Sequence, residues 1–217
     1  MLKIYGADLS TPAIKVRLAA NYMNLDYEYV RVSIRDGENK KEDFLKLHPA
    51  GKIPVIDDEG FVLFESNAIV KYLATKHEAD CYSKQLREQA IIDQWIDFIS
   101  LHINMAMNRV VFNQLFAPLA KKVVDERSLQ DGLNFLDKFL PIMEQQLQEN
   151  EFVCGSTFSI ADIVLLAALD PCEAARVDLK DYKSIVKWRE ILRKKDFYQR
   201  CHKEYGESLK KILNKTA

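Results

Sequence analysis

The stretch of residues 48–73, HPAGKIPVIDDEGFVLFESNAIVKYL, constrains the fold of this chain more than any other. Two short apolar segments, 53–56 and 61–64, flank an acidic turn that ends at Gly60, which is the pattern of a β-hairpin. Apolar residues then recur at helical spacing over 66–75. A hairpin followed directly by an amphipathic helix indicates a unit that mixes strands and helices.

Two details of this stretch point to a bound ligand. Pro54 cannot donate a hydrogen bond to a sheet ladder, so we expect the chain there to face something other than a neighbouring strand. An extended ligand backbone is one candidate. Glu65 and Ser66 open the helix, whose first turn leaves amide groups free to hold an anion.

Residues 1–77 alternate between the two kinds of element. Aromatic and β-branched runs predict strands, and apolar residues at helical spacing predict helices. The expected strands are 2–5, 27–32, 53–56 and 61–64, and the expected helices are 11–23, 41–47 and 66–75. This order, βαβ, then α, then ββα, predicts a four-stranded mixed sheet with helices on its faces.

The chain changes character after a linker at 76–84. No strand pattern appears from Lys84 onward, so residues 84–217 are expected to form an all-helical second domain. Two apolar stripes at helical spacing support this expectation. They are Ile91, Trp95, Phe98, Ile99 and His102 in one helix, and Leu129, Leu133, Leu136, Leu140 and Met143 in another.

The composition excludes some classes of function. Of the 217 residues, 31 are Lys or Arg and 32 are Asp or Glu, and this balance argues against nucleic acid as the main partner. The lysine-rich segment of Lys210, Lys211 and Lys215 is expected to be a solvated helix face. No apolar run approaches the roughly 20 residues of a membrane span. The N-terminus enters a strand pattern directly, which argues against secretion.

The four cysteines are scattered along the chain, without a CxxC pair or another metal-ligand spacing. We therefore expect no metal site, and we expect reduced thiols in a cytoplasmic protein. The four are Cys81, Cys154, Cys172 and Cys201.

One helix start in the second half is clearly marked. Ser159 and Asp162 form an S-x-x-D capping box, in which each side chain can reach the backbone amide of the other residue. The interpretation is structural, because such a cap contributes about 1 kcal/mol to stability.

A hydroxyl also lies at the start of the first expected helix. Pro12 fits the first helical position, so Thr11 is expected to be the N-cap and Ser10 to lie just outside the helix. The positive end of a helix dipole and a nearby donor favour a thiolate over a thiol. Serine and threonine cap helices in many proteins, so this feature alone does not decide between a cap and a thiol site.

Taken in order along the chain, these features resemble the glutathione S-transferase family. Ser10 follows the first strand, Lys52-Ile53-Pro54 precedes the third, Glu65-Ser66 opens the third helix, and FVCGSTFSIADI lies in the helical half. Within the family, LSTPAIKV is similar to the serine-type branch, which includes the phi and theta classes. The resemblance covers essentially the whole chain.

The resemblance implies an α/β, thioredoxin-like domain at 1–77 that binds glutathione, and an all-α domain at 84–217 that helps to bind an electrophile. It implies a cytoplasmic homodimer that conjugates glutathione to apolar electrophiles in detoxification, with glutathione peroxidase activity as a further possibility. Glutathione would be a co-substrate, and no metal is implied. A different class of function remains open, namely a non-catalytic carrier or regulatory protein with the same fold.

The resemblance also assigns roles to single residues. Ser10 would donate a hydrogen bond to the glutathione sulfur. The backbone of Ile53 would pair with the glutathione cysteine, and Pro54 would be cis. Glu65 would face the γ-glutamyl amine, and Ser66 would hold the γ-glutamyl carboxylate at a helix N-terminus.

The glycine end of glutathione is assigned to Asn39, Lys40 and Lys52. This part of the sequence departs from the family pattern, because Asn39 stands where phi sequences usually have histidine. Lys15 replaces the usual arginine. These departures put the glycine-end contacts in doubt more than the chemistry. His48 is interpreted as a loop residue and not as a ligand.

Two other hydroxyls compete with Ser10 for the contact to sulfur. Tyr5 ends the first strand, near where tyrosine-type members place their hydroxyl, but Gly6-Ala7 follows it and not the run usual in that branch. Thr11 is adjacent to Ser10. A cysteine mechanism is disfavoured because positions 8–11 contain no cysteine.

The electrophile site is weakly marked. Met105, Arg109 and Phe112 fall on one helical face, and together with Leu9 they could wall an apolar pocket. The alternative, that Met105 and Phe112 are ordinary core residues, stays open at this point.

Overall fold

The computed structural model describes residues 1–203, and by their contacts these residues form two compact units. The first contains Met1–Tyr82 together with helix α10 (Asp196–His202), and the second contains Ser83–Lys195. The predicted division instead assigned all residues after 84 to one domain.

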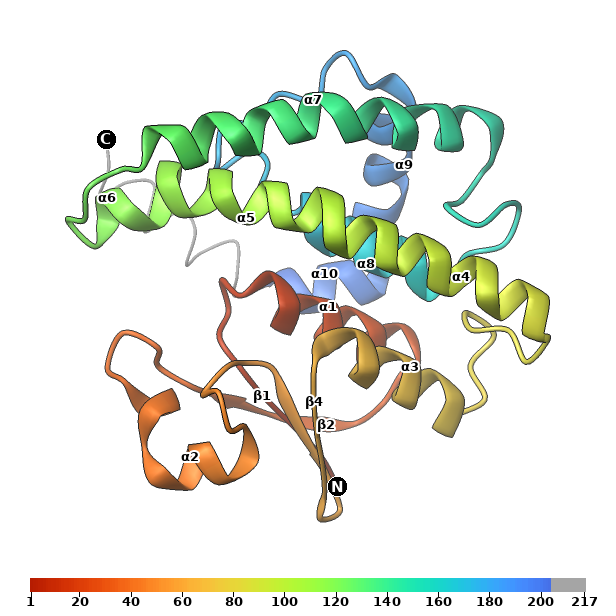
Figure 1. Ribbon diagram of the computed structural model, residues 1–217. Helices are drawn as coiled ribbons and strands as arrows, with labels where there is room; N and C mark the ends of the chain where they lie inside the picture. The colour runs from red at the N-terminus through yellow and green to blue at the C-terminus, as the bar shows by residue number, and fades with distance from the viewer. Residues whose placement is uncertain (204–217) are drawn as a thin grey trace. The chain divides into compact units, whose positions relative to one another are not determined.

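The first unit contains the strands and helices that the sequence predicts, with small shifts at their ends (Figure 1). Its elements are β1 (Leu2–Gly6), α1 (Thr11–Tyr22), β2 (Tyr27–Arg31), a 3₁₀ turn η1 (Glu38–Lys40), α2 (Glu42–Leu47), β3 (Val55–Asp58), β4 (Phe61–Phe64), α3 (Ser66–Lys76) and α10.

The four strands form one mixed sheet, as predicted, and the structure gives their order as β2-β1-β3-β4. β1 pairs in parallel with β2 and antiparallel with β3, and β3 pairs antiparallel with β4. The hairpin begins two residues later than predicted, because the ladder starts at the Tyr5–Val55 pair and Pro54 has no amide hydrogen to contribute to it.

One face of the sheet packs closely against α1. Leu2, Ile4 and Gly6 alternate along β1 as its buried residues. A Cβ atom on Gly6 would lie 2.7 Å from the Cβ of Ala13, so glycine at this position allows α1 to approach the end of β1. α1 in turn packs against α3. The loop that carries Ser10 is therefore anchored between a buried strand end and a buried helix.

The other face of the sheet packs against α2. Phe44 of α2 forms a buried cluster with Val32 and Val55, and Tyr5, Leu47 and Ile53 pack against this cluster. The Tyr5 ring meets the Phe44 ring edge-on at 6.4 Å between centroids. Tyr5 is thus a packing residue of this face.

Helix α10 joins the first unit by packing on α1. The Asn21 side chain donates a hydrogen bond to the Phe197 carbonyl, and Arg200 donates to the carbonyl of Asn21. These contacts connect residues far apart in sequence, which explains why the linear sequence pattern grouped α10 with the other late helices.

The second unit is helical. Its elements are α4 (Leu86–Phe98), η2 (Ile99–Asn104), α5 (Met105–Val111), η3 (Phe112–Phe116), α6 (Ala117–Leu119), α7 (Glu126–Glu149), α8 (Ile160–Leu169) and α9 (Lys183–Arg193). From α4 to α6 the helix is unbroken, with π-helical segments at η2 and η3 (Figure 1). The prediction that the chain from Lys84 onward contains no strand is confirmed for residues 84–203. An isolated β-bridge joins Phe152 to Gly155.

The two predicted apolar stripes have different outcomes. In α7, Leu136, Leu140 and Met143 are buried, as predicted. Along α4 and η2 the buried residues are Ile92, Ile96, Ile99 and Ile103, so of the predicted stripe Ile99 is buried and the others are not. Ile91 is 45% exposed, so its place in the stripe was wrong.

His102 is part of an aromatic cluster and not of the innermost core. Its ring stacks on Phe139 at 4.6 Å and meets Phe98 edge-on at 5.0 Å. Trp95 in turn meets Phe98 at 5.5 Å. These contacts give His102 a packing role.

The capping box at the start of α8 is present as predicted. The carboxylate of Asp162 accepts from the amide and the hydroxyl of Ser159 at 2.9 and 3.1 Å. It also accepts from the Val153 amide at 2.9 Å and the Trp188 indole at 3.0 Å. Burial raises the pKa of Asp162 to about 6, although these donors favour the carboxylate.

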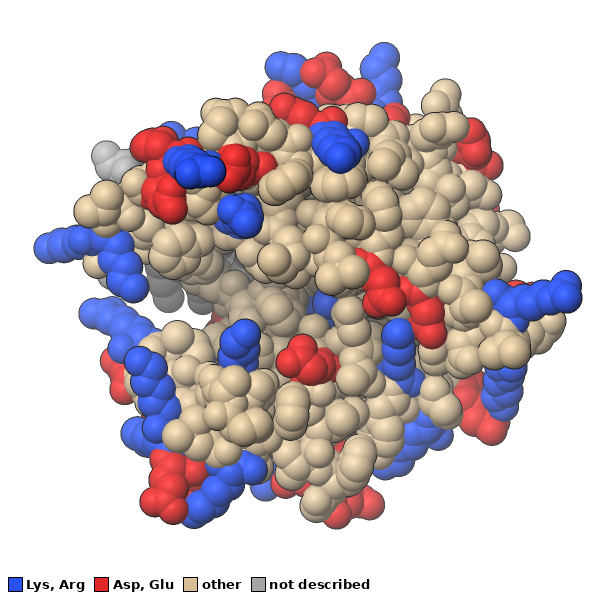
Figure 2. Space-filling view, viewed as in Figure 1, with Lys and Arg blue, Asp and Glu red and all other residues tan. Residues whose placement is uncertain are grey.

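No helix within residues 1–203 has both the length and the apolar character needed to cross a bilayer. Basic and acidic side chains are interspersed on the face shown in Figure 2, as the balanced composition implies. The predicted solvated face at Lys210, Lys211 and Lys215 lies outside the described residues.

Candidate functional site

Ser10, not Thr11, is the N-cap of α1. Its backbone is extended, with φ −86° and ψ 106°, and its hydroxyl accepts a hydrogen bond from the Ala13 amide at 3.4 Å. Thr11 and Pro12 occupy the first two helical positions, where proline is also tolerated because the first-turn amides have no partner within the helix. The capping bond is long, so the Ser10 hydroxyl is held loosely at the positive end of a 12-residue helix.

The backbone around Pro54 is arranged as predicted. The Ile53–Pro54 peptide bond is cis, and the β-ladder begins at the following residue, Val55. Ile53 is half-buried and lies outside the ladder, next to the strand that it precedes. Because the ladder does not use the backbone of Ile53, an extended ligand can pair with this residue and add to the sheet.

The start of α3 has a well-defined geometry. Glu65 is the exposed N-cap of this helix. Its φ is +70°, a backbone conformation that residues other than glycine rarely adopt unless the surrounding structure imposes it. Its carbonyl accepts from the Ile69 amide at 2.9 Å. Ser66 follows as the first residue of this 11-residue helix, in the first turn, whose amides have no acceptor within the helix itself.

Lys15 reaches this same helix start. Its ammonium donates to the Ser66 hydroxyl at 3.1 Å and to the Asn67 side-chain oxygen at 2.7 Å. The replacement of arginine by Lys15 was expected to affect the glycine end of glutathione. Lys15 instead contacts the start of α3, where Ser66 is assigned to the γ-glutamyl end.

Lys15 is also deeply buried. The residue is 5% exposed, and burial lowers the pKa of its amine to about 8, while the charge of Glu65 partly offsets this effect. The Lys15 amine thus lies in the interior of the unit, in contact with Ser66 and Asn67 at the start of α3.

The three residues assigned to the glycine end lie on two neighbouring loops. Asn39 of η1 donates to the Gly51 carbonyl at 2.7 Å, which joins η1 to the loop that carries Lys52. Lys40 and Lys52 are exposed. The side-chain oxygen of Asn39 is buried and has no hydrogen-bond partner among the described residues, which leaves an acceptor next to this loop.

The Gly51 backbone explains why this loop is close to η1. Its φ is +58°, and an added Cβ atom would lie 2.6 Å from the Asn39 carbonyl oxygen. His48 is 4% exposed, accepts from the Ala50 amide at 3.1 Å through its ring Nδ1, and lies 4.5 Å from the Phe64 ring. Its interpretation as a loop residue agrees with these contacts.

A polar cluster that the sequence did not reveal lies beside the Ser10 loop. Asp8 pairs with Arg31 at 3.0 Å and with Arg17 at 3.6 Å. The Arg17 guanidinium stacks over the Tyr29 ring at 4.2 Å. Burial raises the pKa of Tyr29, and its hydroxyl is buried without a hydrogen-bond partner in the described part of the chain. This cluster anchors Asp8, two residues before Ser10.

The residues predicted for the electrophile site are placed as follows. Leu9 is half-buried in the first unit. In the second unit, Met105 is 52% exposed and Phe112 is 45% exposed, and Arg109 is half-buried between them along α5. The alternative that Met105 and Phe112 are core residues is therefore wrong, since large apolar side chains this exposed are available for contact.

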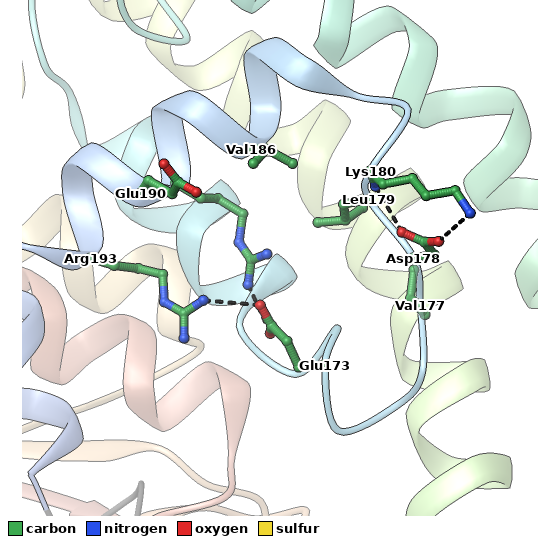
Figure 3. A pocket seen from close by; sticks show the side chains of 9 residues that line it. Glu173, Val177, Asp178, Leu179, Lys180, Val186, Glu190 and Arg193 are labelled. Carbon is green, nitrogen blue, oxygen red and sulfur yellow. Dashed lines mark hydrogen bonds and ion pairs between the residues drawn. The ribbon is translucent and has the colours of Figure 1, made fainter.

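A separate pocket in the second unit has a volume of about 270 Å³ (Figure 3). It lies between α9 and the loop before it, with Val177, Leu179 and Val186 among its lining residues. The charged groups around it are paired with each other, because Glu173 accepts from Arg189 and Arg193. It contains none of the residues predicted for the electrophile.

Sequence reasoning noticed Lys15 but gave it no role, and it did not single out Asn67. The available signal was the position of Lys15 in a helix whose residues 13–21 are all buried. A lysine inside such a run must find acceptors, but which acceptors it finds depends on the packing of α1 on α3.

Two family models match the chain. The glutathione S-transferase N-terminal domain matches residues 1–75, and the glutathione S-transferase C-terminal domain matches residues 104–196. Together they cover more than half of the sequence and both units.

Single relatives give the same result. Glutathione S-transferase 3 from Zea mays is 32% identical over 204 residues, which are 89% of this chain and 92% of the relative. The crystal structure of glutathione transferase F7 from Populus trichocarpa has a TM-score of 0.87 at 29% identity and covers 94% of this chain and 98% of its own. A structure of glutathione S-transferase-I bound with the ligand lactoylglutathione has a TM-score of 0.85 at 27% identity, with coverage of 92% and 97%.

These relatives are transferases by name, which supports a catalytic protein and not the non-catalytic alternative. Their names also include plant F-class members, which fits the serine after β1. The chain therefore belongs to the glutathione S-transferase family, as an enzyme of its serine-type, phi-like branch.

Proposed function

We propose that the enzyme conjugates the thiol of glutathione to small apolar electrophiles and that Ser10 activates this thiol. The observation that carries the proposal is the placement of the Ser10 hydroxyl at the N-terminus of α1, with one long hydrogen bond from Ala13 at 3.4 Å. A hydroxyl held this loosely can turn to donate its proton to a sulfur without disrupting the helix.

The chemistry requires a thiolate. A free thiol has a pKa of about 8.5, and a hydrogen-bond donor together with a helix end can lower this by about one to two units. The thiolate attacks an electrophilic carbon and forms a carbon–sulfur bond, the leaving group departs with its electron pair, and the proton of the thiol passes to solvent. The enzyme contributes proximity and stabilisation of the sulfur anion.

Glutathione would lie along the sheet edge before β3. The backbone of Ile53 would pair with its cysteine, beside the cis bond to Pro54. Ser66 would hold the γ-glutamyl carboxylate at the start of α3, and Glu65 would face the amine. This arrangement is supported by the position of Ile53 outside the ladder and by the first turn of α3, whose amides have no acceptor within the helix itself.

The glycine carboxylate would lie toward the loop of Lys52, with Asn39 and Lys40 beside it. Two exposed lysines supply positive charge there, and the hydrogen bond from Asn39 to Gly51 holds the loop in place. Of the departures from the family pattern, Asn39 thus keeps a positioning contact even without the histidine usual at its place.

The electrophile would be an apolar molecule in contact with Met105, Arg109 and Phe112 of the second unit. The exposure of Met105 and Phe112 supports this assignment, because both present large apolar surface. The chemistry of these side chains favours small aromatic or alkyl compounds, as in detoxification.

We further propose that the enzyme is a cytoplasmic homodimer. Phe61 and Phe64 of β4 are 50% and 37% exposed, a degree of apolar exposure that fits a second copy of the chain. None of the four cysteines, all of which lie within residues 1–203, forms a disulfide bond, which fits a reducing compartment. Light scattering on the purified protein measures the oligomeric state directly.

The test is a comparison of Ser10→Ala with Tyr5→Phe in conjugation of glutathione to a chloronitrobenzene. We expect Ser10→Ala to lower kcat/KM by about tenfold, because the loss of one donor raises the pKa of the bound thiol by about one unit and leaves less thiolate at neutral pH. Tyr5→Phe should stay close to the wild-type rate, because the Tyr5 ring packs against Phe44 on the α2 face of the sheet.

Calorimetry with glutathione separates binding from chemistry in the same two variants. Ser10→Ala should still take up glutathione at millimolar concentration. Activity that survives in Ser10→Ala but is lost in Tyr5→Phe would show that Tyr5, and not Ser10, activates the thiol. If the wild type takes up no glutathione, the proposed function is wrong.

A further inference from the structure

Lys15 is a buried cation whose recorded acceptors carry no charge. Its ammonium has three N–H donors, and the Ser66 hydroxyl and the Asn67 side-chain oxygen use two of them. Both acceptors are neutral. Lys15 is 5% exposed, so its ammonium has lost most of its contact with water, and neither of its two acceptors is an anion.

The charge of Glu65 does not fully offset the effect of burial on Lys15. Glu65 favours the charged form of Lys15, but the effect of burial is larger. Glu65 is also exposed, so solvent screens it. An anion placed at the Ser66 hydroxyl would lie within reach of the same ammonium and would complete its coordination.

We propose that Lys15 is a positioning residue for glutathione, which fixes Ser66 and Asn67 at the start of α3 and supplies the buried positive charge that balances the γ-glutamyl carboxylate. The inference rests on the proposed function, because it takes glutathione as the ligand at α3. It goes beyond the proposed function, because it assigns the positive charge that balances the γ-glutamyl carboxylate to a buried lysine of α1 and not to a surface residue.

The inference predicts a particular pH dependence of binding. Burial lowers the pKa of Lys15 to about 8, so the free enzyme loses this charge as the pH rises through 8. A bound carboxylate favours the charged form. Above pH 8 binding must therefore bring a proton with it, and the dissociation constant should rise by up to about tenfold per pH unit.

The elements packed on α1 carry several charged groups. Glu65, the N-cap of α3, acts on Lys15, and α3 itself carries Lys71 and Lys76. α10 carries Asp196, Arg200 and His202, and its Arg200 contacts the opposite end of α1 at Asn21. β1 carries Lys3 on the strand itself. Among the charged groups of residues 1–203, Glu65 is the one that acts on the Lys15 amine.

The experiment measures binding of S-methylglutathione by calorimetry from pH 6.5 to 9.5, to avoid ionisation of the thiol. Lys15→Met removes the charge, and Lys15→Arg keeps it at every pH because arginine does not deprotonate in this range. We expect Lys15→Met to weaken binding by tenfold or more at pH 7, the effect of losing a charge-assisted contact.

Lys15→Arg is the matched control for the ligand's own amino group, which titrates in the same range. Its affinity should approach that of the wild type at pH 7 and should fall less than the wild type's above pH 8. The difference between the two profiles isolates the proton on Lys15.

A purely structural role is excluded by two further readouts. Lys15→Met should raise KM for glutathione with kcat within about twofold, since Lys15 contacts residues of α3 and not Ser10. Its melting temperature should be equal to the wild type or higher, because a buried cation has been replaced by an apolar side chain of similar length. Lys15→Gln, which keeps a donor without the charge, serves if Lys15→Met does not fold.

Two failures can be told apart. If the wild type does not bind S-methylglutathione, the proposed function itself fails. If the wild type binds and conjugates, but Lys15→Met or Lys15→Gln binds equally well, or if the wild type and Lys15→Arg share one pH profile, then glutathione binding stands and the role of Lys15 is overturned.

Discussion

Two helices of this enzyme begin with a serine N-cap, and the two serines are held very differently. Ser159, at the start of α8, is 3% exposed and gives both its amide and its hydroxyl to the carboxylate of Asp162. Ser10, at the start of α1, is half-buried, and its hydroxyl has a single long bond from Ala13. The same residue type at the same helical position is fixed in one unit and left available in the other.

The surroundings explain the difference. Asp162 is fully buried and also accepts from the Val153 amide and the Trp188 indole, so four donors converge on one carboxylate. Each of these donors would lose its partner if the group moved. α1 contains no acidic residue in its first turn, so Ser10 has no comparable group to hold it. The Ser159 cap therefore stabilises the fold, whereas the Ser10 hydroxyl can turn toward a ligand.

The largest expected effect comes from breaking the fixed cap. Asp162→Ala leaves four buried donors without an acceptor, which should reduce the free energy of unfolding by about 4 kcal/mol. Urea denaturation followed by circular dichroism measures this loss. Asp162→Asn, which keeps one acceptor oxygen, is the matched variant and should lose less.

A second change tests the available cap through its ligand. In the complex with glutathione, Ser10→Ala should raise the pKa of the bound thiol by about one unit, equivalent to about 1.4 kcal/mol, because the donor is lost while the helix end remains. Ultraviolet titration of the thiolate in the binary complex measures the shift. An unchanged thiol pKa would mean that another group stabilises the sulfur, and Thr11→Val would then be the next variant.

The third effect concerns the serine of the fixed cap alone. Ser159→Ala removes one hydroxyl but leaves Asp162 with three donors, so the loss of stability should be about 1 kcal/mol. The same denaturation experiment measures it. A loss as large as that of Asp162→Ala would show that the hydroxyl, and not the carboxylate, organises this helix start.

The outcome of sequence analysis follows the same division between local and distant contacts. The capping box of Ser159 and Asp162 was predicted correctly because both partners lie within four residues. The sheet was also predicted, since its strands alternate clearly and the hairpin turn is short. The start of β3 was misplaced by two residues, because the prediction followed the apolar run from Ile53, whereas the ladder starts only after Pro54.

The errors near Ser10 have a related cause. Either Ser10 or Thr11 could cap α1, and the local sequence does not decide between them, because proline fits both of the next two positions. The contact from Lys15 to Ser66 spans 51 residues and depends on how α1 packs on α3. Likewise, α10 joins α1 through Arg200 and Asn21, 179 residues apart. No periodic pattern encodes such distances.

The smallest expected effect is on the stability of the available cap. Ser10→Ala removes a hydrogen bond of 3.4 Å, near the limit of a useful interaction, so the free energy of unfolding should fall by about 0.5 kcal/mol or less. Denaturation of the free enzyme beside Ser159→Ala measures the pair under one condition. If Ser10→Ala were as destabilising as Ser159→Ala, the Ser10 hydroxyl would be committed to the helix, and it would have to give up that bond in order to reach a thiol.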